Sequence, residues 1–330
     1  MLGKILLRKK ILCSLITPTP LIGRDALRER IIQQMLLPQP QARMPVVICG
    51  MAGVGKSAAA ASVMNDSRIQ QYFEAGVFCV SLGNHPDIPA LLNRWAAECA
   101  IELAAPTVET LVLRLNAYFA RRSALFIIDD VWSVSQVSYF LLGGYGCRVL
   151  ITTRLPPVAH FLAARHTDIL PLPLLNPAES RTLLRALTSQ PYSDELEGLP
   201  LFIHALSALL NQRSGLLSDE GSPALFQQIL SETPPLSYTL PANEPLHSIA
   251  DLLKRSLQDI PAPVQAYLRQ LGQAASETTV FHLNTLQALW HTADAKPIVR
   301  ELVNHGILEP RGQGRFYISQ LMKAFVALYL

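Results

Sequence analysis

The sequence predicts an α/β protein in which a parallel sheet is followed by a helical subdomain and a winged-helix domain. Three observations support this fold class. Short apolar runs alternate with amphipathic stretches between residues 45 and 172, the pattern becomes all-helical from Asn176, and residues 246–330 alternate apolar stripes with turn signals. Unbroken apolar runs are typical of strands covered on both faces, which favours a parallel sheet.

Five apolar runs are the candidate strands of this sheet: residues 45–49, 76–81, 124–128, 148–152 and 168–172. Helical segments lie between them. Residues 55–64 are Ala-rich, Asp87 is a suitable N-cap for a helix over 87–103, and apolar residues four apart support a helix over 107–121. This alternation predicts βαβ units with right-handed crossovers.

The helical subdomain is predicted from two start signals. Asn176, Pro177 and Glu179 have the spacing of an N-cap, a first-turn proline and a capping-box glutamate. A second helix follows the segment Gly198-Leu199-Pro200-Leu201 and runs to about Gln212. Residues 214–246 contain five prolines, which predicts a mostly irregular connection with a short helix around 223–230.

Three apolar stripes and a hairpin signal predict the winged-helix domain. The stripes are Ile249, Leu252, Leu253 and Leu257; Val264, Tyr267, Leu268 and Leu271; and Ile298, Leu302 and Val303. Gly306 is expected to end the third helix. Residues 307–309 and 315–318 flank a turn at 311–314, which predicts a hairpin, and Ser319 is a suitable cap for a final helix.

Composition limits the remaining possibilities. The 330 residues are 50% hydrophobic and 16% charged, which excludes a disordered chain, and the net charge of +3 does not by itself indicate nucleic acid. Five cysteines without a C-x-x-C spacing favour a reducing, cytoplasmic location, and no apolar run is long enough to span a membrane. The expected division is an N-terminal leader or helical appendage (1–17), a nucleotide-binding α/β domain (18–173), the helical subdomain with its Pro-rich connection (174–245) and the winged-helix domain (246–330).

The motif GMAGVGKS at residues 50–57 matches the phosphate-binding P-loop pattern G-x-x-x-x-G-K-[ST], between a predicted strand and a predicted helix. Backbone amides at a helix N-terminus bind phosphate oxygens. Lys56 is expected to reach the β- and γ-phosphates and the Ser57 hydroxyl to ligate Mg²⁺. The expected nucleotide-binding residues of this motif are Gly50, Gly53, Val54, Gly55, Lys56, Ser57 and Ala58.

Two further predicted strands end in charged residues that suit the binding of phosphate and Mg²⁺. ALFIIDD at 124–130 ends in two acids, of which Asp129 is the expected Mg²⁺ ligand and Asp130 the group that orients or deprotonates a water. LITTR at 150–154 ends in Arg154, which is expected to sense the γ-phosphate. Carboxyl ends of parallel strands line the ligand crevice of open α/β sheets, so these groups are expected to meet there. Lys56, Asp130 and Arg154 are the candidate catalytic residues.

The ordered set Ile22-Gly23-Arg24, GMAGVGKS, LFIIDDVW, LITTR and Gly198-Leu199-Pro200-Leu201 resembles NB-ARC ATPases of the STAND class, the nucleotide switches of apoptosis and plant resistance proteins. The resemblance covers roughly residues 18–330 and implies a P-loop NTPase fold. It implies that Ile22, Gly23 and Arg24 lie against the adenine and that Pro200 packs on the nucleotide. It also implies ATP or ADP with Mg²⁺ as cofactors.

The chain departs from this family in its last domain. Family members usually carry a His-Asp pair after a short strand, where this chain has Ser319-Gln320. A serine hydroxyl offers one hydrogen bond to the nucleotide but no switchable charge. Family members also usually carry effector and repeat domains, so the sequence is expected to be a switch core, a fragment or one half of a split system.

The function that follows from these residues is a nucleotide-dependent switch with slow ATP hydrolysis, conformational change and oligomerisation in signalling. Its expected partners are nucleotide, further copies of itself in the ATP state and a separate effector or sensor protein. The alternatives are a DNA-binding STAND-type transcription regulator, a small-molecule kinase or transferase, and an inactive remnant. Lys296, Arg300, Arg311 and Arg315 form only a thin basic face for DNA.

Overall fold

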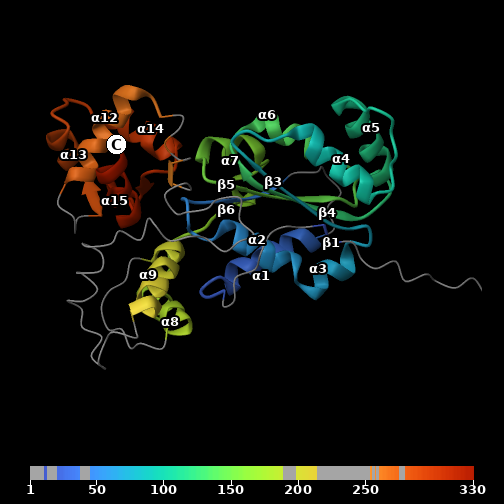
Figure 1. Ribbon diagram of the computed structural model, residues 1–330, viewed down its shortest axis with the longest axis horizontal. Coiled ribbons are helices and arrows are strands. Elements are labelled where there is room, and N and C mark those ends of the chain that lie inside the picture. Colours follow the sequence, from blue (N-terminus) through green and yellow to red (C-terminus); the bar gives the residue numbers. More distant parts are fainter. Residues whose placement is uncertain are drawn as a thin grey trace, which may run out of the picture. The chain divides into compact units, whose positions relative to one another are not determined.

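The computed structural model describes residues 11–12, 21–37, 45–188, 198–213, 253–254, 257, 260–274 and 279–330 (Figure 1). The chain divides into two compact units. Unit 1 comprises Met1–Cys49 and Lys56–Pro171, and unit 2 comprises Gly50–Gly55 and Leu172–Leu330. The predicted helix around 223–230, the 214–246 connection and two residues of the first apolar stripe, Ile249 and Leu252, lie outside the described residues. The four-part division expected above stays a prediction.

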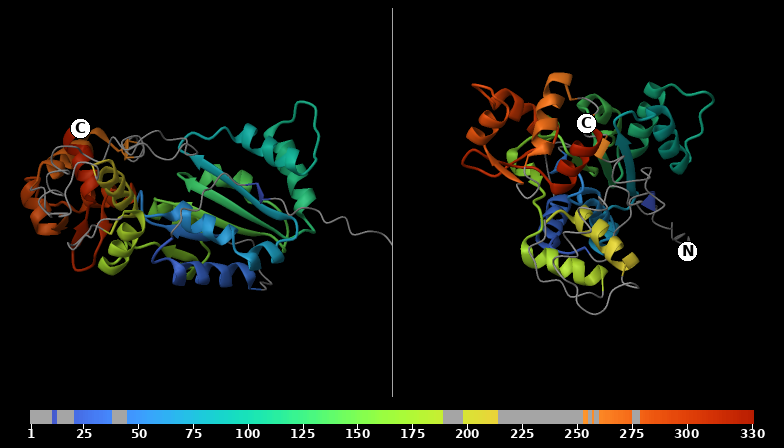
Figure 2. Two further views of the ribbon diagram at one scale, coloured as in Figure 1. Left: turned by 60° about the horizontal axis from the view of Figure 1, so that its bottom comes forward. Right: turned by 60° about the vertical axis from the view of Figure 1, so that its left-hand side comes forward.

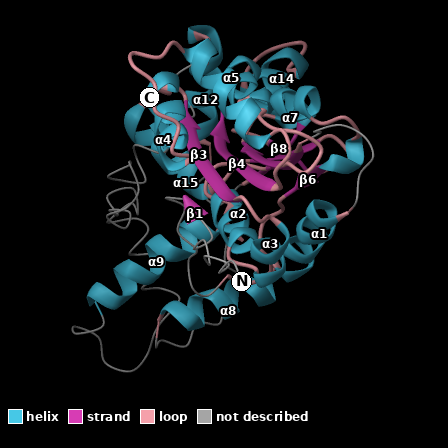
Figure 3. Ribbon diagram, turned by 90° about the vertical axis from the view of Figure 1, so that its right-hand side faces the viewer, coloured by secondary structure: helices cyan, strands magenta, loops and turns pink. Residues whose placement is uncertain are grey.

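Within the described residues, unit 1 contains a parallel sheet of six strands. Figure 3 shows strands of this sheet in magenta among the helices. The strand order across the sheet is β1-β3-β4-β5-β2-β6, and every pair is parallel. The strands are β1 (Ile11–Leu12), β2 (Val46–Cys49), β3 (Gly76–Gly83), β4 (Ala124–Val131), β5 (Arg148–Thr153) and β6 (Ile169–Pro171). All five predicted strands are confirmed, and four of them are almost wholly buried, as their unbroken apolar runs require.

Strand β1 was not predicted. Residues 11–12, which we expected in a leader or helical appendage, pair with Val77 and Phe78 at the edge of the sheet. A two-residue strand is too short for a periodic signal, and its apolar residues fit a helix equally well.

Helices cover both faces of this sheet (Figures 1 and 2). One face carries α1 (Asp25–Leu36), α2 (Lys56–Met64) and α3 (Ser67–Tyr72), and the other carries α4 (Ile88–Glu98), α5 (Val108–Phe119), α6 (Val134–Val137) and α7 (Pro156–Leu162). Single 3-10 turns occupy Ser138–Phe140 and His166–Asp168. The predicted cap is confirmed, since the Asp87 carboxylate accepts a hydrogen bond of 3.0 Å from the Ala90 amide at the start of α4.

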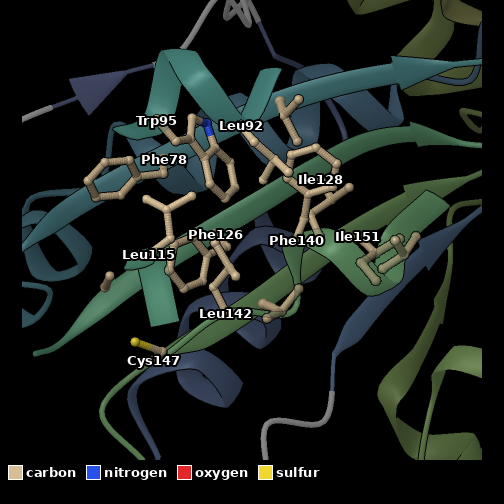
Figure 4. Close-up of a cluster of buried hydrophobic side chains, with 14 of the residues drawn as sticks. Phe78, Leu92, Trp95, Leu115, Phe126, Ile128, Phe140, Leu142, Cys147 and Ile151 are labelled. Carbon is tan, nitrogen blue, oxygen red and sulfur yellow. The ribbon is translucent and has the colours of Figure 1, made fainter. Parts of the chain in front are cut away.

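A hydrophobic core of unit 1 lies between the sheet and the second group of helices (Figure 4). Phe126 of β4 is fully buried at its centre. Its ring stacks on Trp95 with centroids 5.3 Å apart and meets the edge of Phe119 at 4.9 Å. Leu115 and Phe119, which the sequence placed on one face of α5, are both fully buried. This aromatic cluster therefore fixes α4 and α5 on the strands that end at the polar residues described below.

Unit 2 begins with a helical pair. Helix α8 (Pro177–Leu187) has the predicted capping box, in which the Asn176 side chain accepts from the Glu179 amide and the Glu179 carboxylate accepts from the Asn176 amide. Helix α9 (Pro200–Arg213) follows and packs against α8. Both helices begin where the sequence placed them.

The C-terminal part of unit 2 consists of α12 (Ala262–Gln273), β7 (Val280–His282), α13 (Leu283–Leu289), α14 (Lys296–Asn304), β8 (Glu309–Pro310), β9 (Arg315–Tyr317) and α15 (Gln320–Tyr329). The predicted hairpin is confirmed as the antiparallel pair β8 and β9. Gly306 follows α14 with φ +66°, and the Ser319 hydroxyl caps α15, both as expected. The unpredicted strand β7 adds to β9, whereas the winged-helix assignment stays a prediction.

No helix in the described part of the chain is long and apolar enough to cross a membrane. Cys99 and Cys147 are buried, and Cys49 is partly buried. Cys147 lies in the aromatic core of unit 1, where a thiol acts as a small hydrophobic group.

We expect Phe126→Ala to lower the free energy of unfolding by about 3–5 kcal/mol, because it removes the centre of a fully packed aromatic cluster. Urea unfolding followed by circular dichroism measures the change. Leu113→Ala on α5 is the control, because Leu113 is 68% exposed and its truncation should stay within about 0.5 kcal/mol of wild type. Equal stability of the two variants would contradict this description of the core.

Candidate nucleotide site

The predicted P-loop lies where its motif requires. Strand β2 ends at Cys49, residues 50–55 form the loop, and α2 begins at Lys56. Gly53 and Gly55 have φ of +77° and +96°, a region that side-chain-bearing residues rarely adopt. A Cβ on Gly55 would meet nothing within 4 Å, so the free side of this residue is open. Backbone amides of such a loop can approach a phosphate closely.

Within unit 2, Gly53 of the loop packs against the start of α9. The Gly53 carbonyl accepts a hydrogen bond of 3.2 Å from the amide of Leu201. This amide lies in the first turn of α9, where helix N–H groups lack partners in their own helix. A Cβ on Gly53 would come within 2.7 Å of Leu201 Cβ, so only glycine fits. Gly53, which the sequence predicts to bind phosphate, therefore also caps the helix that begins at Pro200.

In unit 1 the centre of the site is the carboxylate of Asp129, which is 4% exposed. Its Oδ2 accepts a hydrogen bond of 3.0 Å from the Ser57 hydroxyl, and its Oδ1 accepts one of 2.6 Å from Thr152. Burial raises the pKa of Asp129 to about 6, against the opposing effect of these two hydrogen bonds and of Lys56. The two predicted Mg²⁺ ligands, Ser57 and Asp129, are thus in direct contact.

The next residue, Asp130, lies in an irregular part of β4. The pairing of β4 with β5 shifts register between Ile128 and Val131, and Asp130 has φ +50°. Such a bulge turns a side chain away from the regular strand alternation. The Asp130 carboxylate forms an ion pair of 3.2 Å with Arg154. Predicted catalytic acid and predicted sensor therefore contact each other directly.

Arg154 is also fixed by an aromatic ring. Its guanidinium lies 4.6 Å from the centroid of the Trp132 ring, within the range of a cation–π interaction. Both residues are buried, Arg154 at 6% exposure. The contact of Trp132 with Arg154 was not predicted, although Trp132 closely follows the two acids of β4.

Lys56 is buried close to these charges. Burial lowers the pKa of its ammonium to about 8, and repulsion from Arg154 acts in the same direction, while Asp130 and Asp129 oppose the shift. A buried cation at the start of α2 adds to the positive end of the helix dipole. Lys56, Asp129 and Arg154 are buried and Asp130 is partly buried, so two cationic and two acidic side chains form one largely buried cluster near the carboxyl ends of β4 and β5.

The remaining predicted residues lie elsewhere in the two units. In unit 1, Ile22 and Gly23 precede α1, and the buried Arg24 stands at its N-cap position. In unit 2, Ser319 is 2% exposed, and its hydroxyl accepts a hydrogen bond of 3.1 Å from the Met322 amide. The hydroxyl proton is not used in this bond. The nucleotide contacts assigned to Ile22, Gly23, Arg24, Pro200 and Ser319 stay predictions.

The family of this chain follows from its match to a family model. The family model of the NB-ARC domain matches residues 24–193, slightly more than half of the sequence. The chain belongs to the NB-ARC family. The motif set identified from the sequence falls within this match, apart from Ile22, Gly23 and the segment that begins at Gly198.

Relatives of this NB-ARC protein include plant and animal proteins. Disease resistance protein RPM1 of Arabidopsis thaliana is 24% identical over 273 residues, which cover 74% of this chain and 28% of RPM1. Apoptotic protease-activating factor 1 of Danio rerio is 26% identical over 344 residues, which cover 94% of this chain and 26% of that protein. The chain thus spans about a quarter of the length of these relatives.

A solved structure supports the fold. The Walker-type ATPase of Pyrococcus abyssi is 12% identical and has a TM-score of 0.59, with 97% of this chain and 98% of that chain covered. At this identity the likeness concerns the fold alone. The parallel sheet of unit 1 and the helices on its two faces have the P-loop NTPase fold.

The residues of this NB-ARC site suit a nucleotide and a divalent metal. Ser57 and Asp129 offer two oxygen ligands, the small protein share that Mg²⁺ typically takes beside phosphates and water. Lys56 supplies a cation, and the open side of Gly55 leaves room for phosphate. The donor set therefore fits Mg²⁺ with a nucleotide.

We expect Lys56→Met to stabilise the nucleotide-free protein at pH 7 by about 3 kcal/mol, because the lowered pKa of Lys56 means that its charge disfavours the folded state. This destabilisation is present at pH 7 and disappears as the pH rises from 8 towards 10.5 and Lys56 loses its proton. The advantage of the variant should therefore fall to about half at pH 9.5. Urea unfolding at both pH values measures it, and a pH-independent difference would contradict the assigned pKa.

We expect Gly53→Ala to lower the free energy of unfolding by about 2–3 kcal/mol, because its Cβ would meet Leu201 and its φ of +77° is strained for alanine. Gly55→Ala is the matched control. It has the same kind of strain, at φ +96°, but no neighbour within 4 Å, so its loss should be about 1 kcal/mol smaller. Thermal unfolding without nucleotide compares them, and equal losses would contradict the packing of Gly53 on Leu201.

Proposed function

We propose that this NB-ARC chain is a nucleotide-dependent switch that binds ADP and Mg²⁺-ATP, hydrolyses ATP slowly and changes conformation between the two states. The single observation that supports this most strongly is the cluster of the buried Lys56, Asp129 and Arg154 with the partly buried Ser57 and Asp130. Such a cluster costs stability, as the shifted pKa values of Lys56 and Asp129 indicate. A structural role does not require buried charges of this kind, whereas phosphate chemistry does.

Each residue has a distinct task in this proposal. Lys56 neutralises the β- and γ-phosphates, while Ser57 and Asp129 hold Mg²⁺, which when bound withdraws charge from the phosphates. Asp130 orients or deprotonates the attacking water. Arg154 stabilises the charge that develops on the γ-phosphate.

In this proposal, the ion pair of Asp130 and Arg154 is the element that changes between the two nucleotide states. At 3.2 Å the two side chains neutralise each other. A γ-phosphate competes with Asp130 for Arg154, and an ADP lacks the group that competes. Triphosphate and diphosphate therefore favour different arrangements of the same pair, which is the differential interaction a nucleotide switch needs.

Wider roles follow from this switch. We propose that the ATP state self-associates, that a separate effector or sensor protein reads the state, and that the protein acts in the cytoplasm. The names of the apoptotic and plant relatives support a signalling role. The DNA-binding alternative is not favoured, since Arg311 is paired with Glu309 at 3.5 Å and the basic face is correspondingly weaker.

We expect Lys56→Ala to reduce ATP affinity at least 100-fold, because it removes the buried cation expected at the β- and γ-phosphates. Isothermal titration of purified, nucleotide-stripped protein with ADP and Mg²⁺-ATP measures this. Lys296→Ala is the control, since Lys296 is an exposed residue of α14. Mass spectrometry of nucleotide carried through purification of the wild type identifies the resting ligand. Equal nucleotide binding by wild type and Lys56→Ala would refute the proposed function.

We expect Asp130→Asn to bind Mg²⁺-ATP within about 3-fold of wild type but to hydrolyse it at least 100-fold more slowly, because an amide cannot accept the proton of the water. Asparagine tolerates the left-handed backbone of Asp130, so the fold is kept. Single-turnover phosphate release measures the rate. A variant that hydrolyses at the wild-type rate would remove Asp130 from the mechanism.

A further inference from the structure

One hydroxyl contacts both acids of the site. Thr152 of β5 is fully buried, and its Oγ1 donates a hydrogen bond of 2.6 Å to Oδ1 of Asp129. The same oxygen accepts a hydrogen bond of 3.0 Å from the backbone amide of Asp130. A hydroxyl has one proton to donate and lone pairs to accept, so both bonds form at once. Thr152 therefore links the side chain of one acid to the backbone of the next.

This link lies at the point where β4 leaves its regular pairing. Neighbouring residues of a regular strand direct their side chains to opposite faces, which would separate Asp129 from Asp130. The register shift between Ile128 and Val131 and the φ of +50° at Asp130 change that alternation. The Asp130 amide, which lies within the shifted register, bonds the Thr152 hydroxyl. Removing the hydroxyl would leave a partly buried amide without this partner at a strained residue.

We propose that Thr152 is a positioning residue that fixes which oxygen of Asp129 is offered to the metal and holds Asp130 in its catalytic backbone conformation. With Oδ1 bound to Thr152, only Oδ2 faces Ser57, the other expected metal ligand. In this proposal Thr152 acts through the two acids, to which both of its hydroxyl hydrogen bonds run. This inference rests on the proposed function, because it assigns the support of the same Mg²⁺-nucleotide site.

The adjacent threonine provides a matched control. Thr153 is equally buried, but its hydroxyl donates 2.7 Å to the carbonyl of Val131 and accepts 3.1 Å from the amide of Leu155. Both of its partners are backbone groups. Loss of either hydroxyl thus removes one buried and one partly buried hydrogen bond, whereas only the loss at Thr152 affects a carboxylate of the site.

The test compares Thr152→Val, Thr152→Ser and Thr153→Val in the full chain. We expect both valine variants to lower the urea midpoint by comparable amounts. Thr152→Val should bind ADP in EDTA within about 2-fold of wild type, need at least 10-fold more Mg²⁺ for half-maximal ATP binding, and turn over at least 10-fold more slowly at saturating Mg²⁺. Thr152→Ser keeps the hydroxyl and should restore both properties, and Thr153→Val should match wild type in both.

Two results would overturn this inference while leaving the proposed function intact. One is a Thr152→Val variant with the Mg²⁺ requirement and turnover of wild type. The other is a Thr153→Val variant with the same defects as Thr152→Val, which would indicate a general structural effect. If Thr152→Val does not fold, Thr152→Ala also lacks the hydroxyl and has the same expected outcome. A wild-type protein that binds no Mg²⁺-ATP refutes the proposed function and this inference together.

Discussion

The hydrogen bonds that Asp129 accepts from Ser57 and Thr152 are the constraint on which the site depends. They join the first turn of α2 to the ends of β4 and β5, so three elements share one buried carboxylate. Keeping that carboxylate charged inside the protein is unfavourable, as its pKa of about 6 indicates. The arrangement persists because hydroxyl donors and Lys56 compensate part of the cost. Substrate binding can then use a charge cluster that folding has already assembled.

The pKa of Lys56 is lowered and the pKa of Asp129 is raised, and both shifts have the same main cause. Burial raises the pKa of the acid and lowers that of the base, so both groups lie closer to neutrality than in water. Asp130 and Arg154 relieve the same burial by pairing with each other. Two cations and two carboxylates give the cluster no net charge, and a polyphosphate that enters it must bring its own counter-ion. This balance is consistent with the proposal that nucleotide enters the site together with a divalent metal.

Much of the fold was predictable because its signals are local. Apolar runs marked all five predicted strands, and Asp87, Asn176 and Ser319 marked helix starts through short hydrogen bonds to the next turn. Three of the predicted site residues, Lys56, Ser57 and Asp129, also lie close together as expected. Strands β1 and β7 were not predicted, since two or three residues carry no measurable period. Local sequence likewise cannot show a register shift, because the shift depends on how β4 pairs with β5.

Thr152 and Gly53 illustrate what a motif leaves unstated. Two successive threonines of the LITTR segment fit a buried strand equally well, and only the bulge in the neighbouring strand makes one of them a partner of the acids. Gly53 is required by the phosphate-binding loop, yet its missing side chain also admits Leu201, and its carbonyl caps α9. A substitution at Gly53 would therefore affect both the conformation of the loop and its packing against α9. Gly53 thus belongs both to the predicted phosphate-binding loop and to the packing at the start of α9, and the second of these roles depends on a contact with a residue far along the chain that the motif itself does not encode.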